Sequence, residues 1–375
     1  MKKPLYLLFL CLPLSFFAQI PHPDNHSHNR LIEFPDLPGY LTLLVDFHQH
    51  SVFSDGSVWP DIRVQEALKD GVDAISLTEH LEYQPHAADI PNPDRNRSYH
   101  IAEERARPYD LMVIRGAEIT RDMPPGHSNA VFIQDANKLL IQDSVEVFRE
   151  ANRQGAFVFW DHPNWIAQRD DGIATLTDMH KMLFEEGLLQ GIEVVNEMTY
   201  SDEALQIALD YNLTIMGTSD IHGLVDWQFD PEHGGHRPVT LVFAGERSPE
   251  AIKEGLMKRR TVAWYNNTLI GRDSLLVPLV ESCLKVVKAE YQGPYSVINV
   301  HIENSSDAAF ILANMSDYTF HANTDIVTIH PNSQTTIQVK TLKQLNSFEL
   351  PFSVLNAVTA PKTHPEIKLK IEVTY

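Results

Sequence analysis

The amino-acid sequence predicts an α/β barrel followed by a small antiparallel β-sandwich. Short β-type runs alternate with helical segments from residue 41 to about residue 275, a pattern typical of a parallel sheet covered by helices. Seven or eight such repeats over roughly 230 residues match the size of a (β/α) barrel. After about residue 282 the helical segments stop, and apolar and polar residues alternate with a period of two. That alternation indicates strands with one buried face.

The elements of the barrel region follow from these patterns in chain order. We expect β-type runs at residues 43–47, 73–78, 111–118, 130–133, 156–160, 191–195, 213–217 and 239–244. We expect helices at residues 61–69, 144–154, 176–186, 202–211 and 248–259. Pro60 supports the start of the first helix, because proline suits the first helical turn.

The C-terminal region has a different pattern. Runs at residues 297–302, 336–340 and 367–373 alternate between apolar and polar side chains, and turn-forming residues such as those at 304–307 separate them. Strands of this kind without intervening helices are typical of an immunoglobulin-like sandwich. We assign residues 282–375 to this sandwich and find no set of catalytic residue types within it.

The first eighteen residues have the features of a secretory signal. Lys2 and Lys3 precede an apolar run, and Ala18 ends a stretch suited to cleavage. We therefore expect a mature chain that begins at Gln19 and is secreted or periplasmic. The apolar run is shorter than the ~20 residues of a membrane helix, and we expect no membrane span. Residues 1–18 are thus the expected signal peptide, 19–40 a linker and 41–281 the barrel domain.

The overall charge disfavours one class of partner. The 375 residues include 30 Lys and Arg against 50 Asp and Glu, which gives a formal net charge of −20. Such a chain repels rows of phosphates, so we expect no nucleic-acid partner. Of the two cysteines, Cys11 lies in the expected signal, which leaves Cys283 alone in the mature chain. Without a disulfide, stability is expected from packing or bound metal.

Residue types that bind metals stand where the predicted strands end. In a parallel barrel the carboxyl ends of all strands open on one face, so these side chains should converge. His48 and His50, like Asp220 and His222, are two positions apart, and side chains with this spacing point the same way along an extended strand. The expected metal ligands are His48, His50, Asp55, His80, Glu118, His127, His162, Asp220 and His222.

This donor set predicts more than one cation. Six imidazoles and three carboxylates exceed the four donors of a tetrahedral ion, so two or three divalent ions are expected. Glu118 is the natural bridge, because a carboxylate has two oxygens to share. Mixed nitrogen and oxygen ligands suit Zn, Mn or Fe rather than Ca or Mg. A single strand-end histidine is ordinarily explained by a hydrogen bond in the core, and only the coincidence of five or six such strand ends favours metal.

Several segments resemble the PHP (polymerase and histidinol phosphatase) superfamily, over about residues 41–275. The segments that carry the resemblance are, in order, Val45–Ser51, Phe53–Gly56, Gly71–His80, Gly116–Glu118, Gly126–His127, Asp161–Pro163 and Ser219–His222. The resemblance implies a distorted (β/α)7 barrel of TIM type with a trinuclear metal site. Carried over by position, it places one ion on His48, His50, Glu118 and Asp220, a second on Glu118, His127 and His162, and a third on Asp55, His80 and His222. Some members have His at the position of Asp55.

The resemblance also implies an activity. It points to hydrolysis of a small phosphorylated compound, with a metal-bridged hydroxide as the expected nucleophile. The catalytic residues would be His48, His50, Glu118 and Asp220, which hold the ions around that nucleophile.

Contacts to the substrate are predicted from loop arginines. Arg97, Arg121 and Arg237 lie in predicted loops at or near the ligand face, and a guanidinium matches the geometry of phosphate.

Two alternative functions remain open at this stage. An amidohydrolase-like enzyme that cleaves C–N or lactone bonds uses similar ligands, but its bridging modified lysine is missing from these strand ends and Glu118 takes the bridging role. A non-catalytic exported protein that binds metal or a partner would have lost ligands, and none of the nine positions is missing.

Overall fold

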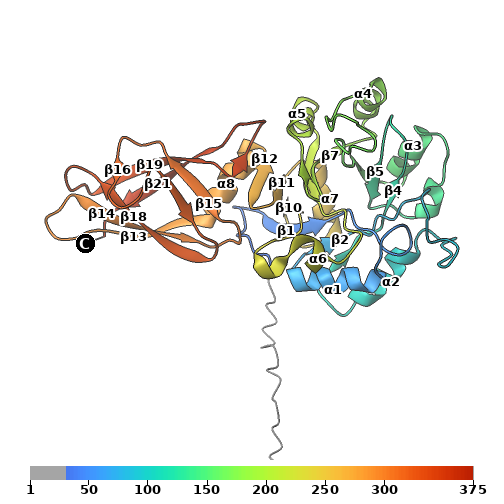
Figure 1. Cartoon of the computed structure of the whole chain (residues 1–375), viewed down its shortest axis with the longest axis horizontal. Helices are drawn as coiled ribbons and strands as arrows, with labels where there is room; N and C mark the ends of the chain where they lie inside the picture. The colour runs from blue at the N-terminus through green and yellow to red at the C-terminus, as the bar shows by residue number, and fades with distance from the viewer. Residues whose placement is uncertain (1–30, 375) are drawn as a thin grey trace, which may run out of the picture.

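The computed structural model describes residues 31–374, which form two parts along the longest axis of the molecule (Figure 1). The barrel lies at one end and the β-sandwich at the other. This arrangement confirms the predicted fold class. The expected signal peptide and residues 19–30 of the expected linker lie outside the described residues.

Two sheets form the wall of the barrel. Their strands are β1 (Leu41–Asp46), β2 (Ala74–Ile75), β3 (Met112–Val113), β4 (Gly116–Ile119), β5 (Ser128–Val131), β6 (Phe157–Trp160), β7 (Gly191–Asn196), β8 (Thr199–Tyr200), β9 (Thr214–Thr218), β10 (Val239–Ala244), β11 (Thr261–Tyr265) and β12 (Thr268–Gly271). One sheet has the order β12-β11-β10-β1-β2-β3, and the other has the order β4-β5-β6-β7-β8 with β9 beside β7. The Thr240 hydroxyl bonds Gly217 at 2.9 Å, and the Thr261 hydroxyl donates to the Ile215 carbonyl at 2.8 Å. These bonds join the two sheets between β9 and the β10–β11 pair.

Helices and short 3-10 turns surround these sheets. They are α1 (Pro60–Asp70), α2 (Arg97–Ala106), η1 (Ala136–Leu139), α3 (Glu146–Arg153), α4 (Asp178–Glu185), α5 (Asp202–Asp210), α6 (Val225–Phe229), η2 (Pro231–His233), α7 (Pro249–Met257) and α8 (Asp273–Cys283). The five helices expected from the sequence correspond to α1, α3, α4, α5 and α7. Within residues 31–374 no helix is long and apolar enough to cross a bilayer.

The strands of the barrel are not all parallel. β1 pairs parallel with β2 but antiparallel with β10, and both β4 with β5 and β5 with β6 are antiparallel pairs. The two pairs of β5 are explained by residues 120–127, which connect β4 to β5 without a helix. A parallel connection needs a crossover of a dozen or more residues, so this shorter link returns the chain in the opposite direction. The reversal of β5 and the antiparallel pair of β1 with β10 both distort the barrel.

The C-terminal part is a sandwich of two four-stranded antiparallel sheets, ordered β13-β14-β18-β16 and β17-β15-β19-β21. The strands of this part are β13 (Leu284–Tyr291), β14 (Val297–Asn304), β15 (Phe310–Asn314), β16 (Thr319–Phe320), β17 (Ile326–Ile329), β18 (Ser333–Lys340), β19 (Ser347–Val354), β20 (Ala357–Val358) and β21 (Glu366–Glu372). In β21 the apolar residues Ile367, Leu369 and Ile371 are buried, and the charged residues between them are exposed. This is the alternation that the sequence predicted.

The two parts are joined by shared backbone pairing. β20 leaves the sandwich and pairs parallel with β12, with Leu269 opposite Ala357 and Ile270 opposite Val358. The Asn356 amide donates to the carbonyls of Asn267 and Ala309, at 2.7 Å in both cases. One apolar core runs from the barrel through α8 into the sandwich.

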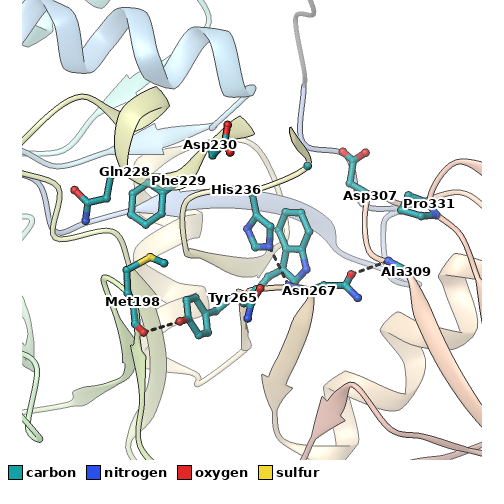
Figure 2. Close-up of a pocket in the computed structure, with 14 residues that line it drawn as sticks. Met198, Gln228, Phe229, Asp230, His236, Tyr265, Asn267, Asp307, Ala309 and Pro331 are labelled. Atoms are coloured by element: carbon teal, nitrogen blue, oxygen red, sulfur yellow. Dashed lines mark hydrogen bonds between the residues drawn. The ribbon is translucent and has the colours of Figure 1, made fainter. Parts of the chain in front are cut away.

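A pocket of about 480 Å³ lies between barrel loops and the sandwich, as Figure 2 shows. His236 stacks on Trp264 there, with ring centroids 3.5 Å apart and 7° between the planes. The His236 ring accepts the backbone N–H of Asn267 at 3.2 Å, and the Asn267 side chain accepts the backbone N–H of Ala309 at 2.8 Å. The walls of this pocket therefore help to hold the two parts together.

Candidate metal centre

The exit of β1 places two histidines on one buried centre. The Asp46 carboxylate at the end of β1 accepts the Ser219 N–H at 3.1 Å and the Ser219 hydroxyl at 2.6 Å, which anchors the strand end. The loop then returns so closely that a Cβ on Gly56 would lie 2.7 Å from the backbone of His50. Glycine is therefore required at this position. His48 and His50, which this loop carries, have no exposed surface.

Glu118 lies in the middle of the site and is fully buried. Its two carboxylate oxygens face different histidines. Oε2 lies near His48 Nε2 (3.4 Å), His50 Nε2 (3.3 Å) and His80 Nδ1 (3.0 Å), and Oε1 lies near His127 Nδ1 (2.6 Å) and His162 Nε2 (3.9 Å). A carboxylate that bridges two cations needs this arrangement.

Asp220 adds a second carboxylate to the same histidines. It follows β9 with a φ of 47°, in the left-handed region that non-glycine residues rarely adopt and that is common at functional sites. Asp220 Oδ1 lies 3.1 Å from Nε2 of both His48 and His50. The next residue, Ile221, pairs with Gln49 through its backbone, so the loop after β9 is tied to the loop after β1.

Asp55 gathers the remaining histidines. Its Oδ1 lies 3.2 Å from His222 Nε2, and its Oδ2 lies 3.3 Å from His80 Nε2. The His50 ring stacks between the two, with centroids 4.6 Å from His80 and 4.3 Å from His222. The His222 side chain is 41% exposed, whereas that of His80 is 8% exposed. His222 therefore marks the open side of the site.

The donor geometry fits divalent cations. Ligands at the 2.0–2.1 Å bond length of a tetrahedral zinc site lie about 3.4 Å apart, close to most separations above. Within residues 31–374, buried donor atoms of the site that lack a hydrogen-bond partner include His48 Nε2, His50 Nε2, both oxygens of Glu118 and Asp220 Oδ1. Buried polar atoms without partners are rare and costly, and a bound cation would satisfy them.

All nine residues selected from the sequence lie in or beside this cluster. The groups whose ligand atoms all lie within 4.8 Å of one another are His50, Asp55, His80 and His222; His48, His50 and Asp220; His80, Glu118 and His127; and His48, Glu118 and Asp161. His162 stands slightly apart, with its ring centroid 5.0 Å from that of His127. The structure thus places the nine together, and their division among individual ions stays a prediction.

Neighbouring histidines favour the ionised forms of Glu118 and Asp220. Burial alone would raise the pKa of Glu118, but His80 and His127 outweigh burial and hold that pKa well below its ordinary value. Burial opposes ionisation of Asp220 as well, and His48 helps to hold the pKa of Asp220 well below its ordinary value. The centre therefore offers negatively charged oxygens to a cation.

Glu193 on β7 orients His48 from behind. Its Oε1 lies 2.8 Å from His48 Nδ1, and its Oε2 accepts the His162 backbone N–H at 2.7 Å and the Asn196 amide at 2.9 Å. A carboxylate at Nδ1 fixes the tautomer and leaves Nε2 available to a metal. Glu193 was not among the residues predicted from the sequence. A lone acid inside an apolar strand is the signal that would have identified it.

A second network holds His50. Its Nδ1 lies 3.2 Å from the Ser54 hydroxyl, which donates to Glu79 Oε2 at 2.5 Å. The same oxygen of Glu79 accepts the Ser51 backbone N–H at 3.1 Å. Glu79 is 3% exposed. The loop that carries His50 is therefore held by a buried acid whose own oxygens are satisfied by the chain.

The prediction that Arg237 contacts substrate is wrong. Arg237 is fully buried, its Nε donates to Asp70 at 2.8 Å, and its Nη1 lies 3.3 Å from Asp46 Oδ2. Its position before a strand suggested a surface loop, but the residues that lead into β10 already lie inside the wall of the barrel. Arg237 supports the strand end that carries the metal centre and is not accessible to a substrate.

The other two arginines are engaged by neighbours. Arg97 begins α2 instead of lying in a loop, and its guanidinium lies 4.7 Å from the Phe53 ring centroid. Arg121 forms an ion pair with Glu82 and donates to the Ile141 carbonyl at 2.6 Å. Their role as substrate contacts stays a prediction.

An aromatic side chain borders the cluster. Trp165 is 43% exposed, and its ring lies 5.6 Å from His127 and 5.1 Å from His162 between centroids. With His222, it is one of the accessible groups next to the buried donors.

The fold and the donor cluster together define the class of barrel hydrolases that depend on metal ions. Comparison with known proteins supports this class. The chain is similar to a crystal structure from Bacteroides vulgatus ATCC 8482, described as a two-domain protein containing a predicted PHP-like metal-dependent phosphoesterase. The identity is 42%, the match covers 91% of this chain and 98% of that chain, and the TM-score is 0.85. The chain therefore belongs to the PHP-like metal-dependent phosphoesterases.

Other comparisons are weaker or cover less of the chain. Residues 284–370 match a family described as an Ig-like domain. An amidohydrolase from Chromobacterium violaceum, solved with bound sulfate and no metal, is 16% identical, with coverage of 48% of this chain and 87% of that chain and a TM-score of 0.35. That likeness is too weak to carry an argument. No curated protein matches the chain.

Proposed function

We propose that the protein is a metal-dependent phosphoesterase that hydrolyses a small phosphorylated compound at a site for three divalent cations. The observation that carries the proposal is the fully buried Glu118, whose two oxygens face separate sets of histidines. Membership of the PHP-like family supports a phosphoester as the substrate. Zn, Mn and Fe are the cations that suit this mixture of nitrogen and oxygen donors.

The chain would hold the cations through three sets of donors: His48, His50, Asp220 and Glu118; His127, His162 and Glu118; and Asp55, His80 and His222. Bound divalent cations supply Lewis acidity toward phosphoryl oxygens and lower the pKa of water toward 7. Glu193 Oε1 lies 2.8 Å from His48 Nδ1 and so keeps His48 in the tautomer whose Nε2 faces the centre. The Thr120 hydroxyl lies 2.8 Å from His80 Nδ1 and restrains that ring.

The substrate would enter on the side of His222 and Trp165, the accessible groups at the border of the site. His48, His50, His80, Glu118 and His127 are buried, which limits the access of bulk water to this side of the site. A net charge of −20 favours a small ester over a polymeric phosphodiester such as nucleic acid. From the pattern of residues 1–18 we also propose that the protein acts outside the cytoplasm.

The test is hydrolysis after controlled metal loading. Metal-depleted protein is reconstituted with Zn²⁺, Mn²⁺ or Fe²⁺ and assayed with p-nitrophenyl phosphate and bis(p-nitrophenyl) phosphate. The Glu118→Gln and Asp220→Asn variants should lose about 100-fold or more in kcat/KM, because each removes a charge at the centre. His233→Ala is the matched control, since this histidine pairs with Asp230 on the surface and its side chain is 78% exposed.

Two outcomes would overturn the proposal. Fully loaded protein that cleaves an amide or lactone panel but no phosphoester would be an amidohydrolase-like enzyme. Fully loaded protein that cleaves neither would be a binding protein.

A further inference from the structure

Asp161 is a buried acid that is not one of the nine predicted ligands and to which no role has been assigned so far. It directly follows β6 and is 1% exposed. Its backbone N–H donates to the His127 carbonyl at 3.1 Å, so the main chain is held in place beside the metal centre. Within residues 31–374, neither oxygen of its side chain has a hydrogen-bond partner. A buried carboxylate in this state is costly unless a charge or donor compensates it.

The neighbours of Asp161 do not supply that compensation. A ligand atom of Asp161 lies within 4.8 Å of ligand atoms of both His48 and Glu118. Glu118 is itself an acid, and Asp220 and Glu193 bring two more carboxylates to His48. The other histidines of the site face Glu118 and Asp220, and none lies within hydrogen-bond distance of Asp161 among residues 31–374, so they do not offset the repulsion between Asp161 and the neighbouring carboxylates. A cation bound between Asp161, His48 and Glu118 would supply the missing positive charge.

Two other buried acids at the site provide a comparison. Glu193 accepts hydrogen bonds from the His162 N–H and the Asn196 amide, and Glu79 accepts from Ser51 and Ser54. These acids are satisfied by the chain and act by holding ligands in place. Asp161 lacks such donors among the described residues, which separates it from the supporting acids and groups it with the ligands.

We propose that Asp161 is a tenth metal ligand, which binds through a carboxylate oxygen the cation shared by His48 and Glu118. This inference rests on the metal site of the proposed function but not on the reaction. An added carboxylate makes that position richer in oxygen, and oxygen-rich positions suit Mn²⁺ better than a site of imidazoles alone does.

A cysteine at position 161 provides a direct test. Co²⁺ is titrated into metal-depleted Asp161→Cys protein, and near-ultraviolet absorption is recorded. Thiolate-to-cobalt charge transfer appears only when the sulfur is bound to the ion, so the proposal expects this band in Asp161→Cys. Glu79→Cys is the matched control and should show no band, because Glu79 is held by serines. The wild type, with buried Cys283, is the baseline.

A second variant guards against misfolding of the first. Asp161→Asn keeps the shape of the side chain and removes its charge. Elemental analysis and chelator competition should show one ion lost or bound at least about 10-fold more weakly, with unchanged far-ultraviolet circular dichroism. Weakened binding in Asp161→Asn together with a folded, cobalt-binding Asp161→Cys that lacks the band would make Asp161 a positioning residue and overturn the proposal.

Unchanged metal content and affinity in Asp161→Asn would overturn it as well. Because all these readouts are binding measurements, they remain decisive even if the loaded wild type hydrolyses no phosphoester. A wild type that binds no divalent cation would overturn both proposals.

Discussion

Replacement of Arg237 by methionine should destabilise the barrel far more than loss of an ordinary arginine. Arg237 has no exposed surface, and it lies 2.8 Å from an oxygen of Asp70 and 3.3 Å from an oxygen of Asp46. Methionine replaces much of the side-chain volume but leaves two buried carboxylates without their cation. Removal of one partner from a buried ion pair costs about 3–5 kcal/mol, and we expect a loss in that range.

The loss should depend on pH with a defined sign. Burial raises the pKa of Asp46, and Arg237 opposes this rise. Without Arg237 the pKa of Asp46 in the folded protein rises further, so Asp46 takes up a proton more readily as the pH falls. Protonation removes the uncompensated charge. The variant should therefore lose less stability at pH 5 than at pH 8.

Urea unfolding of the wild type, Arg237→Met and Arg107→Met measures the effect. Arg107 is the control, because its side chain is 68% exposed and its contact with Glu103 is a surface pair at 3.6 Å. Exposed pairs contribute roughly 0–1 kcal/mol. A loss for Arg237→Met that matches the control, or one that is equal at pH 5 and pH 8, would refute the reasoning.

Three further predictions concern other parts of the chain. Glu193→Gln should weaken metal binding about 10- to 100-fold, because it removes the charge that orients His48, and an unchanged affinity in chelator competition would contradict this. Burial lowers the pKa of His180 from about 6.5 to about 4, and the Nδ1 of the ring accepts the Thr177 N–H at 3.2 Å. Between pH 6.5 and pH 4 the free energy of unfolding of the wild type should therefore fall relative to that of His180→Gln, by about 2 kcal/mol at pH 5. Urea unfolding that gives both proteins the same pH dependence would refute this. Mass spectrometry of the exported chain should find an N-terminus at Gln19, and an uncleaved chain would argue against the signal.

The clustering of the donor side chains could be predicted because these residues occupy one type of position. His48, Glu118 and Asp220 all stand at or just beyond the ends of apolar runs, and the barrel brings such ends together. This rule needs no knowledge of the loops between the strands. It selects residues that stand at the end of a strand. In the sequence, this end is marked by the change from apolar to polar residues.

Residues that act from inside an element could not be found by that rule. Glu193 lies within β7, where the pattern alone reads as a buried strand, and only the neighbouring His48 shows what its carboxylate does. Helix α2 was not expected because its buried residues are the small Ser98, Ala102 and Ala106, which form no apolar stripe. Asp161 stands at a strand end, but only the absence of donors around it in the described structure separates it from a supporting acid.

The pairing of β20 with β12 has a consequence for any attempt to divide the chain. A fragment that stops at Cys283 would leave the backbone groups of Leu269 and Ile270 without their partner strand, and it would uncover the apolar side of α8. An open strand edge beside apolar surface recruits other chains. The barrel prepared alone is therefore expected to aggregate, and low activity of such a fragment would reflect self-association and would not show that the sandwich takes part in the reaction.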